Sequence, residues 1–477
     1  MQPLDPARLV FNGIDAATGE YLYAPSTLDE FATTILDGAE VGARFHVSEL
    51  AERNARAEPT FGVAYGVDPE KLDQAGWGFV AAADAPAEVL EALEPLTTLR
   101  RCQAADRFRS FTGEAGLRCG ETKDEWLSRH GMGPGDAEPE KVPYYLLLVG
   151  GPGDIPYRFQ YELDVNYAVG RIAFDTPNEY QRYGEAVVSA EASSPQAASS
   201  LAIFAPENAD DRATALSANE LARPLCAELP TKSYSDCSVE HALAGAATKQ
   251  QLASFMWGPE AADVLFTASH GVGFPPGHDQ QRLLQGALLC QDWPGPRAWH
   301  NKPLEHNFYL AGSDIPDSVD TLPRIVFAFA CFGAGTPLDD DFGYLKWRRP
   351  RKLAPQPFIA RLPQMMLGHP ARRTLAFVGH IERAWEYSFS TPKAGRQIGA
   401  FVSTLASIVD GRRVGYALEY FNARYASVGS DLANLLEIYA RKHKRPPRHE
   451  LAAKLIAAND ARNYALLGDP AVRLSAP

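Results

Sequence analysis

ADVLFTASHG, residues 262–271, and RIVFAFACFG, residues 324–333, are the two stretches that decide the fold of this 477-residue chain. Each is a short apolar run that ends in a turn containing glycine, which is typical of a buried strand in a parallel sheet. In an open α/β sheet, functional sites lie beyond the carboxyl ends of the strands. One of these ends carries His270 and the other carries Cys331. We therefore expect a thiol nucleophile and its base to meet there.

Further apolar runs and helical patterns alternate along the chain. Strands are expected at 142–149, 167–174, 201–205 and 374–379, and helices close the chain at about 395–410, 413–426, 430–442 and 447–458. This alternation predicts an α/β protein with a mostly parallel sheet and helices on both faces. The polar, glycine-rich residues 103–140 are expected to form a loop or linker.

Three parts are predicted along the chain. Residues 1–140 form an N-terminal α/β region of undefined role, residues 141–195 a first subdomain segment, and residues 196–477 a catalytic subdomain that carries His270 and Cys331.

Composition excludes several classes of function. The net charge of −13 argues against a nucleic-acid-binding protein, whose affinity comes largely from basic patches. The six cysteines include no CxxC pair, so neither a zinc site nor a disulfide framework is indicated, and no cofactor is expected. The first residues lack a basic stretch followed by an apolar one, and no run approaches the ~20 apolar residues of a membrane span. These features predict a cytoplasmic protein with no membrane partner.

The order of the His-Gly and Ala-Cys-x-Gly strand ends resembles the caspase-like cysteine peptidases of clan CD, which include caspases, gingipains, separases, clostripain and bacterial CHAT proteases. Three further segments are similar to the gingipain family: LLLVGGPGDIP at 146–156, VGRI at 169–172 and LGDPAVRL at 467–474. The resemblance covers about residues 140–475, and residues 1–60 match no segment of that family. It implies a caspase-like three-layer fold and an endopeptidase that cuts protein substrates.

The absence of a secretion signal makes the chain look like an intracellular relative of the exported gingipains. Intracellular bacterial caspase-like proteases often act in antiphage defence or regulated cell death, including the cleavage of gasdermins. The resemblance therefore implies a protein substrate of this kind and leaves room for an activating partner protein.

Cys331 is the expected nucleophile and His270 the expected general base, which later protonates the leaving amine. By resemblance, the backbone N–H groups of Gly271 and Cys331 form the oxyanion hole. Taken alone, Cys331 could equally be a buried core thiol and His270 a satisfied core histidine.

The remaining site residues are less sharply indicated. Asp154, in the Asp-Ile-Pro turn, is the candidate for the acid that orients His270, and the alternative is a turn-forming aspartate. Asp164 in the substrate pocket, with Glu382 and Asp341 as rivals, would select Arg or Lys before the scissile bond, whereas Arg383 pointing inward would select acidic residues. Trp385 is a candidate wall of the cleft.

The loop from Thr336 to Pro357 suggests activation by cleavage, because caspases carry a cleavable linker just after the nucleophile. We hypothesise a cut within Trp347–Lys352, with a solvated loop or a docking patch as the alternatives. Asp339-Asp340-Asp341 could contribute to a calcium site.

The alternative function is a catalytically silent caspase-like scaffold that binds a partner protein. A serine hydrolase is disfavoured because the chain has no GxSxG elbow.

Overall fold

The computed structural model centres on one ten-stranded sheet. It describes residues 9–23, 26–30, 62–133, 135, 137–192, 198, 200–232, 237–258, 260–319, 321–342, 351–370, 374–391, 394–442 and 446–474. The sheet strands are β2 (Trp77–Ala81), β3 (Phe108–Phe111), β4 (Tyr145–Val149), β5 (Ala168–Ile172), β6 (Ser200–Ala205), β7 (Ser238–Leu243), β8 (Val264–Ala268), β12 (Ile325–Phe329), β15 (Ala376–His380) and β18 (Tyr464–Gly468). Their spatial order is β3-β2-β4-β5-β18-β15-β12-β8-β6-β7.

All neighbouring strands of this sheet are parallel except β15 and β18. The five strands from β3 to β18 therefore run opposite to the five strands from β15 to β7. As a consequence, the carboxyl ends of β8 and β12 lie at one edge of the sheet, and the carboxyl ends of β4 and β5 lie at the other.

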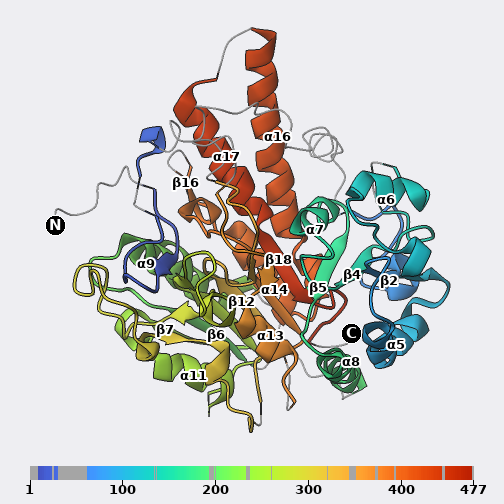
Figure 1. Ribbon diagram of the computed structural model, residues 1–477, viewed down its shortest axis with the longest axis horizontal. Helices are drawn as coiled ribbons and strands as arrows, with labels where there is room; N and C mark the ends of the chain where they lie inside the picture. The colour runs from blue at the N-terminus through green and yellow to red at the C-terminus, as the bar shows by residue number, and fades with distance from the viewer. Residues whose placement is uncertain are drawn as a thin grey trace.

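Helices cover the sheet on both sides (Figure 1). From β6 the chain crosses to β7, toward the edge of the sheet, through α10 (Arg223–Lys232). From β12 it crosses to β15, in the other direction along the sheet, through α13 (Arg361–Leu367). Right-handed crossovers therefore place these two helices on opposite faces. The expected α/β class with a mostly parallel sheet is confirmed. The larger helices are α5 (Glu94–Ala104), α7 (Tyr157–Leu163), α8 (Pro177–Ala192), α10 (Arg223–Lys232), α11 (Lys249–Trp257), α13 (Arg361–Leu367), α14 (Gly399–Val409), α16 (Glu419–Arg441) and α17 (Arg448–Arg462).

The expectation of a loop at residues 103–140 is wrong. This stretch holds the edge strand β3 and the helix α6 (Lys123–Arg129), which begins with a capping box formed by Thr122 and Glu125. Only one side chain of β3 is buried, so the strand lacks the continuous apolar run by which the other strands were predicted. The division of the chain at residues 140 and 195 stays a prediction.

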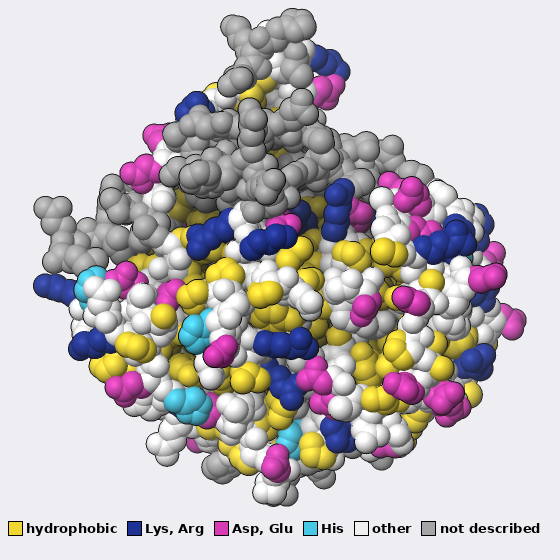
Figure 2. All heavy atoms as spheres, in the orientation of Figure 1, with side chains coloured by type: hydrophobic (Ala, Val, Ile, Leu, Met, Phe, Trp, Pro, Cys, Tyr) yellow, Lys and Arg dark blue, Asp and Glu magenta, His cyan; other side chains and the backbone are white. Residues whose placement is uncertain are grey.

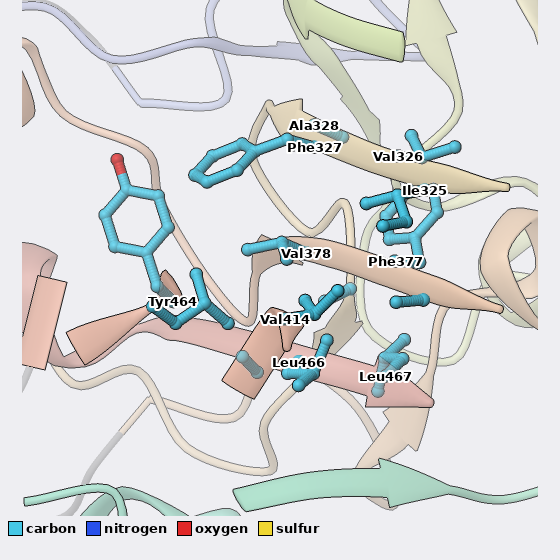
Figure 3. Packing of buried hydrophobic residues seen from close by; sticks show 14 of the residues in the cluster. Ile325, Val326, Phe327, Ala328, Phe377, Val378, Val414, Tyr464, Leu466 and Leu467 are labelled. Atoms are coloured by element: carbon cyan, nitrogen blue, oxygen red, sulfur yellow. The ribbon is translucent and has the colours of Figure 1, made fainter. Parts of the chain in front are cut away.

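The core runs through the middle of the sheet (Figure 3). Val326 of β12 pairs with Phe377 of β15, which in turn pairs with Leu467 of β18, and all three side chains are buried. This packing holds the two oppositely directed groups of strands together and keeps the ends of β8 and β12 in fixed positions.

The Leu-Gly-Asp-Pro motif turns the chain directly after β18. Gly468 has a φ of +117°, and a Cβ there would lie 2.4 Å from the carbonyl oxygen of Leu375, so only glycine fits. The buried Asp469 accepts hydrogen bonds from Trp77 Nε1 at 2.9 Å and from Arg100 Nε at 2.7 Å. The motif therefore ties the N-terminal strands to the last strand.

Two long helices, α16 and α17, pack against each other and extend beyond the sheet at the top of Figure 1. Across the described part of the chain, no helix combines the length and the apolar character needed to cross a bilayer. Basic and acidic side chains are both spread over the face seen in Figure 2.

Candidate active site

The sheet brings His270 and Cys331 to the same edge. Ala268, the last residue of β8, pairs with Phe329, the last residue of β12. His270 and Cys331 each lie two positions beyond these strand ends. Gly271 packs against the backbone of Cys331, where a Cβ would lie 1.8 Å from the Cys331 carbonyl oxygen. Both side chains are fully buried. The two residues therefore follow neighbouring strands at the same edge of the sheet.

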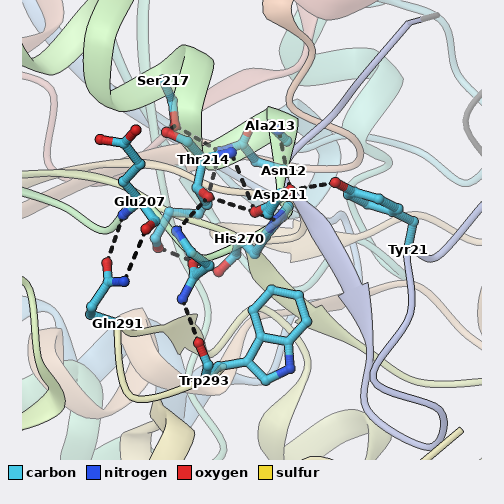
Figure 4. Close-up of polar contacts among 12 residues, drawn as sticks. Asn12, Tyr21, Glu207, Asp211, Ala213, Thr214, Ser217, His270, Gln291 and Trp293 are labelled. Atoms are coloured by element: carbon cyan, nitrogen blue, oxygen red, sulfur yellow. Dashed lines mark hydrogen bonds and ion pairs between the residues drawn. The ribbon is translucent and has the colours of Figure 1, made fainter. Parts of the chain in front are cut away.

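The carboxylate beside His270 belongs to Asp211 and not to Asp154. His270 donates from Nε2 to Asp211 Oδ2 at 2.6 Å (Figure 4). Asp154 lies beyond the carboxyl end of β4, at the opposite edge of the sheet, where it lines a hollow together with Gly150 and Phe174. Asp154 was predicted from its Asp-Ile-Pro turn, and the reversal of strand direction between β15 and β18 places this turn at the other edge of the sheet.

Asp211 is held in place by its own helix and by a tyrosine. It is the N-cap of α9 (Arg212–Leu216), accepting from the backbone N–H of Ala213 at 3.1 Å and from Thr214 Oγ1 at 2.6 Å, and Tyr21 also donates its hydroxyl to it. Burial acts to raise the pKa of Asp211, but the His270 charge and these hydrogen bonds lower it below its ordinary value. Asp211 is therefore an ionised carboxylate that can fix the orientation of the imidazole.

The second ring nitrogen of His270, Nδ1, takes no part in holding the ring in place. Nδ1 has no hydrogen-bond partner among the described residues. The ring is flanked by Tyr21 and Trp293, whose centroids lie 5.9 Å and 6.0 Å from that of His270. A ring held on two sides and anchored through Nε2 has Nδ1 as its only site for accepting a proton.

Three backbone N–H groups surround Cys331. Ala384 donates to its Sγ at 3.3 Å, while the N–H groups of Gly271 and of Cys331 itself donate to one carbonyl oxygen, that of Asn12, at 2.9 Å and 3.0 Å. Burial raises the pKa of the Cys331 thiol, and the Ala384 N–H acts in the opposite direction. The two N–H groups predicted to form an oxyanion hole thus converge on a single oxygen.

The residue after Cys331 has an uncommon backbone conformation. Phe332 has a φ of 58°, in the left-handed region that bulky residues rarely adopt, and its N–H donates to the Glu382 carbonyl oxygen at 2.8 Å. Strained residues of this kind cluster at functional sites, and this one directly follows Cys331.

The pocket candidates after β15 are largely paired with one another. Arg383 contacts Glu382 Oε1 through Nη1 at 3.1 Å and Asp340 Oδ2 through Nη2 at 2.7 Å, and its guanidinium lies 3.8 Å from the centre of the Tyr23 ring. Neither Glu382 nor Arg383 is therefore an unpaired charge. Trp385 packs against the ring of Phe11, with 5.1 Å between centroids.

Asp164 is not brought to Cys331. It is the C-cap of α7, next to the start of β5, and β18 and β15 separate that strand from β12.

The three consecutive aspartates all form ion pairs: Asp339 with Lys352, Asp340 with Arg383 and Asp341 with Arg462. The described residues contain no group of three or more His, Cys, Asp or Glu side chains arranged to hold a metal. Most of Trp347–Lys352 lies outside the described residues, so activation by cleavage there stays a prediction.

We expect Glu386 to make the stability of this region depend on pH. Burial raises its pKa to about 7, although Arg212 acts in the opposite direction from 3.6 Å. An acid whose pKa is raised by folding destabilises the fold as pH rises from its ordinary pKa to the raised value. We expect Glu386→Gln to unfold like the wild type at pH 4 and to be more stable by about 2 kcal/mol at pH 8, measured by urea titration. A difference that did not change between these two pH values would contradict this expectation.

Two residues of the site were not found from the sequence. Asp211 follows β6, which is the neighbour of β8 and runs parallel to it. A polar residue soon after a third apolar strand was the one sequence signal that could have indicated it. Asn12 lies in residues 1–60, where no pattern pointed to the site.

Neither a family model nor a curated protein matches the chain. Three solved structures are similar to it at 12% identity. One is described as a protease, with a TM-score of 0.47, and the match covers 83% of this chain and 78% of that one. The Arg-specific cysteine proteinase gingipain R has a TM-score of 0.43 and coverages of 84% and 78%. The complex of the pro- and mature domains of RgpB from Porphyromonas gingivalis has a TM-score of 0.42 and coverages of 84% and 81%.

Proposed function

We propose that the protein is a cysteine endopeptidase in which Cys331 is the nucleophile, His270 the general base and Asp211 the residue that positions His270. The N–H groups of Gly271 and Cys331 stabilise the oxyanion of the tetrahedral intermediate. No metal or organic cofactor takes part in this proposal.

One observation carries the proposal. Two backbone N–H groups, at the ends of neighbouring strands, donate to the same carbonyl oxygen at 2.9 Å and 3.0 Å, and one of them belongs to the residue that bears the thiol. An oxyanion hole requires this convergence of donors next to a nucleophile. A structural cysteine in a core requires nothing of the kind.

The chemistry follows the usual order for a thiol nucleophile. His270 takes the Cys331 proton on Nδ1, and Sγ attacks the carbonyl carbon of the peptide bond. His270⁺ then protonates the departing amine, which leaves an acyl-enzyme thioester. Water, deprotonated by His270, releases the acid product and restores the thiol.

The test is a library of fluorogenic peptides that differ at the residue before the scissile bond, incubated with the wild-type protein and with Cys331→Ala. Cleavage that is lost in the variant supports the peptidase and defines the pocket. Equal cleavage by both proteins would contradict it, and binding without cleavage would favour the silent scaffold.

Asp211→Asn separates the charge of Asp211 from its structural role. Asparagine also caps helices well, so α9 should persist and the melting temperature should stay within a few degrees. Without the carboxylate we expect kcat to fall by about 10- to 100-fold with little change in KM, because the imidazolium that forms is no longer stabilised. Unchanged kcat in a folded variant would exclude the positioning role.

The resemblance extends the proposal to substrate and setting. A bacterial cytoplasmic enzyme of this kind would act on a protein substrate such as a gasdermin in antiviral defence or cell death, with an activating partner protein as a further element. Cleavage of a purified gasdermin by the wild type, and none by Cys331→Ala, is the expected result.

A further inference from the structure

Residues 9–23, which we call the N-terminal hairpin, lie in the candidate active site. The hairpin is closed by hydrogen bonds from Asp15 N–H to the Glu20 carbonyl at 2.8 Å and from Leu22 N–H to the Gly13 carbonyl at 3.2 Å. Tyr21, on its returning arm, donates to Asp211 (Figure 4). The hairpin therefore contacts the same groups that the proposed chemistry uses.

The backbone before Asn12 pairs antiparallel with the segment after β15. Asn12 N–H donates to the Ala384 carbonyl at 3.0 Å, and Glu386 N–H donates to the Val10 carbonyl at 3.4 Å. Between them, Phe11 and Trp385 form an antiparallel β-bridge. Main-chain pairing of this type is how an extended peptide is held irrespective of its sequence. Three consecutive residues are thus fixed up to the carbonyl that enters the oxyanion hole.

The backbone after Asn12 is held by another strand. β1 (Gly13–Asp15) pairs parallel with β9 (Gly271–Gly273), and Ala16 N–H donates to the Gly273 carbonyl at 2.8 Å. The chain is therefore anchored on both sides of one peptide bond, with the carbonyl of that bond between the N–H groups of Gly271 and Cys331.

The Asn12 side chain occupies its own polar pocket. It is 2% exposed, and its Nδ2 donates to the Ser269 carbonyl at 3.2 Å and to Ser217 Oγ at 3.3 Å. These acceptors suit an uncharged amide donor. A carboxylate would face the Ser269 carbonyl oxygen, and a longer basic side chain would need a deeper pocket.

Gly13 lies directly against the thiol. A Cβ added to it would lie 3.0 Å from Cys331 Sγ and 2.7 Å from Leu22 Cδ1. The bond between Asn12 and Gly13 is thus beside the sulfur, and a side chain on the residue that follows Asn12 would press against Cys331 Sγ and the end of the Leu22 side chain.

We propose that the Asn12–Gly13 bond is the first substrate of this enzyme and that the site selects asparagine before the scissile bond. This inference rests on the proposed function. The sulfur of Cys331 forms a thioester with the Asn12 carbonyl carbon as the C–N bond breaks. The Gly13 nitrogen leaves as an amine with the proton held by His270. Water then adds to the thioester and releases residues 1–12 with a terminal carboxylate. Until that cut, the hairpin excludes other substrates.

The first experiment measures intact mass and N-terminal sequence of the purified full chain. We expect the wild type to begin at Gly13 and Cys331→Ala to remain whole. Asn12→Asp should slow the cut by about 10- to 100-fold, because the donor of a buried hydrogen-bonded pair is lost. Ala17→Val is the matched control, since Ala17 is exposed in the same hairpin and its variant should be cut at the wild-type rate.

The second experiment supplies the substrate separately. Gly13→Val should expel the hairpin, since the added side chain meets Leu22 and Cys331. This variant should cleave Leu-Val-Phe-Asn-aminocoumarin at least about 10-fold faster than the same peptide ending in Asp, Lys or Leu, as expected for a pocket built to bind an amide.

The outcomes separate the two proposals. A wild-type chain that stays whole, or is cut elsewhere, would overturn the inference of self-cleavage. Cleavage by Gly13→Val after residues other than asparagine would overturn the specificity and leave the peptidase intact. No cleavage of any peptide by any variant would overturn both the inference and the proposed function.

Discussion

Replacing Cys331 with alanine should lower kcat/KM for every peptide substrate by at least about 10⁴-fold, because the sulfur that forms the covalent bond is removed. His270→Ala should have a similar effect, and the double variant should be no worse than either single one, since the two groups act as a unit. The measurement is a progress curve with the best peptide of the library. Active-site titration gives the fraction of competent enzyme.

The matched control is Cys290→Ala. Cys290 is as buried as Cys331, and its thiol donates to the Leu288 carbonyl oxygen at 3.4 Å, with no group of the site as its partner. This variant should keep activity within about twofold, as expected for a change outside the site. Loss of activity in both variants would point to general destabilisation, and retained activity in Cys331→Ala would remove Cys331 from the mechanism.

Replacing Asp469 with alanine should lower the free energy of unfolding by about 3–5 kcal/mol. The buried Arg100 guanidinium would keep Glu191, 2.7 Å from its Nη2, as a charged partner and Gln103 as a neutral one, and Trp77 Nε1 would lose its acceptor. A charge left incompletely paired in the core carries a penalty that solvent cannot relieve. Urea denaturation followed by tryptophan fluorescence measures the effect.

Glu437→Ala is the control for this second substitution. Glu437 pairs with Arg441 on the exposed surface of α16, where ion pairs contribute little, so we expect a change of at most about 0.5 kcal/mol. If Asp469→Ala were no less stable than Glu437→Ala, the terminal motif would have no role in joining the strands.

Much of the fold could be predicted from continuous apolar runs. The strands with Val264 and Ile325 are buried on both faces, so their sequences carry a signal that depends on no distant contact. The adjacency of His270 and Cys331 followed, because neighbouring parallel strands end at the same edge. β18 was recognised only as a motif, since its five residues follow a helix without an intervening turn signal.

The rest of the candidate site depended on information that short patterns do not carry. Asp154 was chosen on a local motif, whereas its position relative to His270 is set by the reversal of strand direction between β15 and β18. Asn12 meets the N–H groups of Gly271 and Cys331 through its backbone carbonyl, a group that every residue has, so its sequence position carried no signal. From its neighbours in the sequence, Asp211 is recognisable only as a helix N-cap. Its contact with His270 depends on the fold.

The position of β18 bears on how the chain is made. This strand comes last in sequence among the sheet strands, yet it lies between β5 and β15, so the two halves of the sheet cannot be joined through it before it has been made. Synthesis at about 5–20 residues per second delays its arrival well behind that of Cys331. The half that carries Cys331 therefore lacks the antiparallel neighbour of β15 until residues 464–468 have been translated. The peptidase that we propose would therefore stay structurally incomplete until β18 has been made.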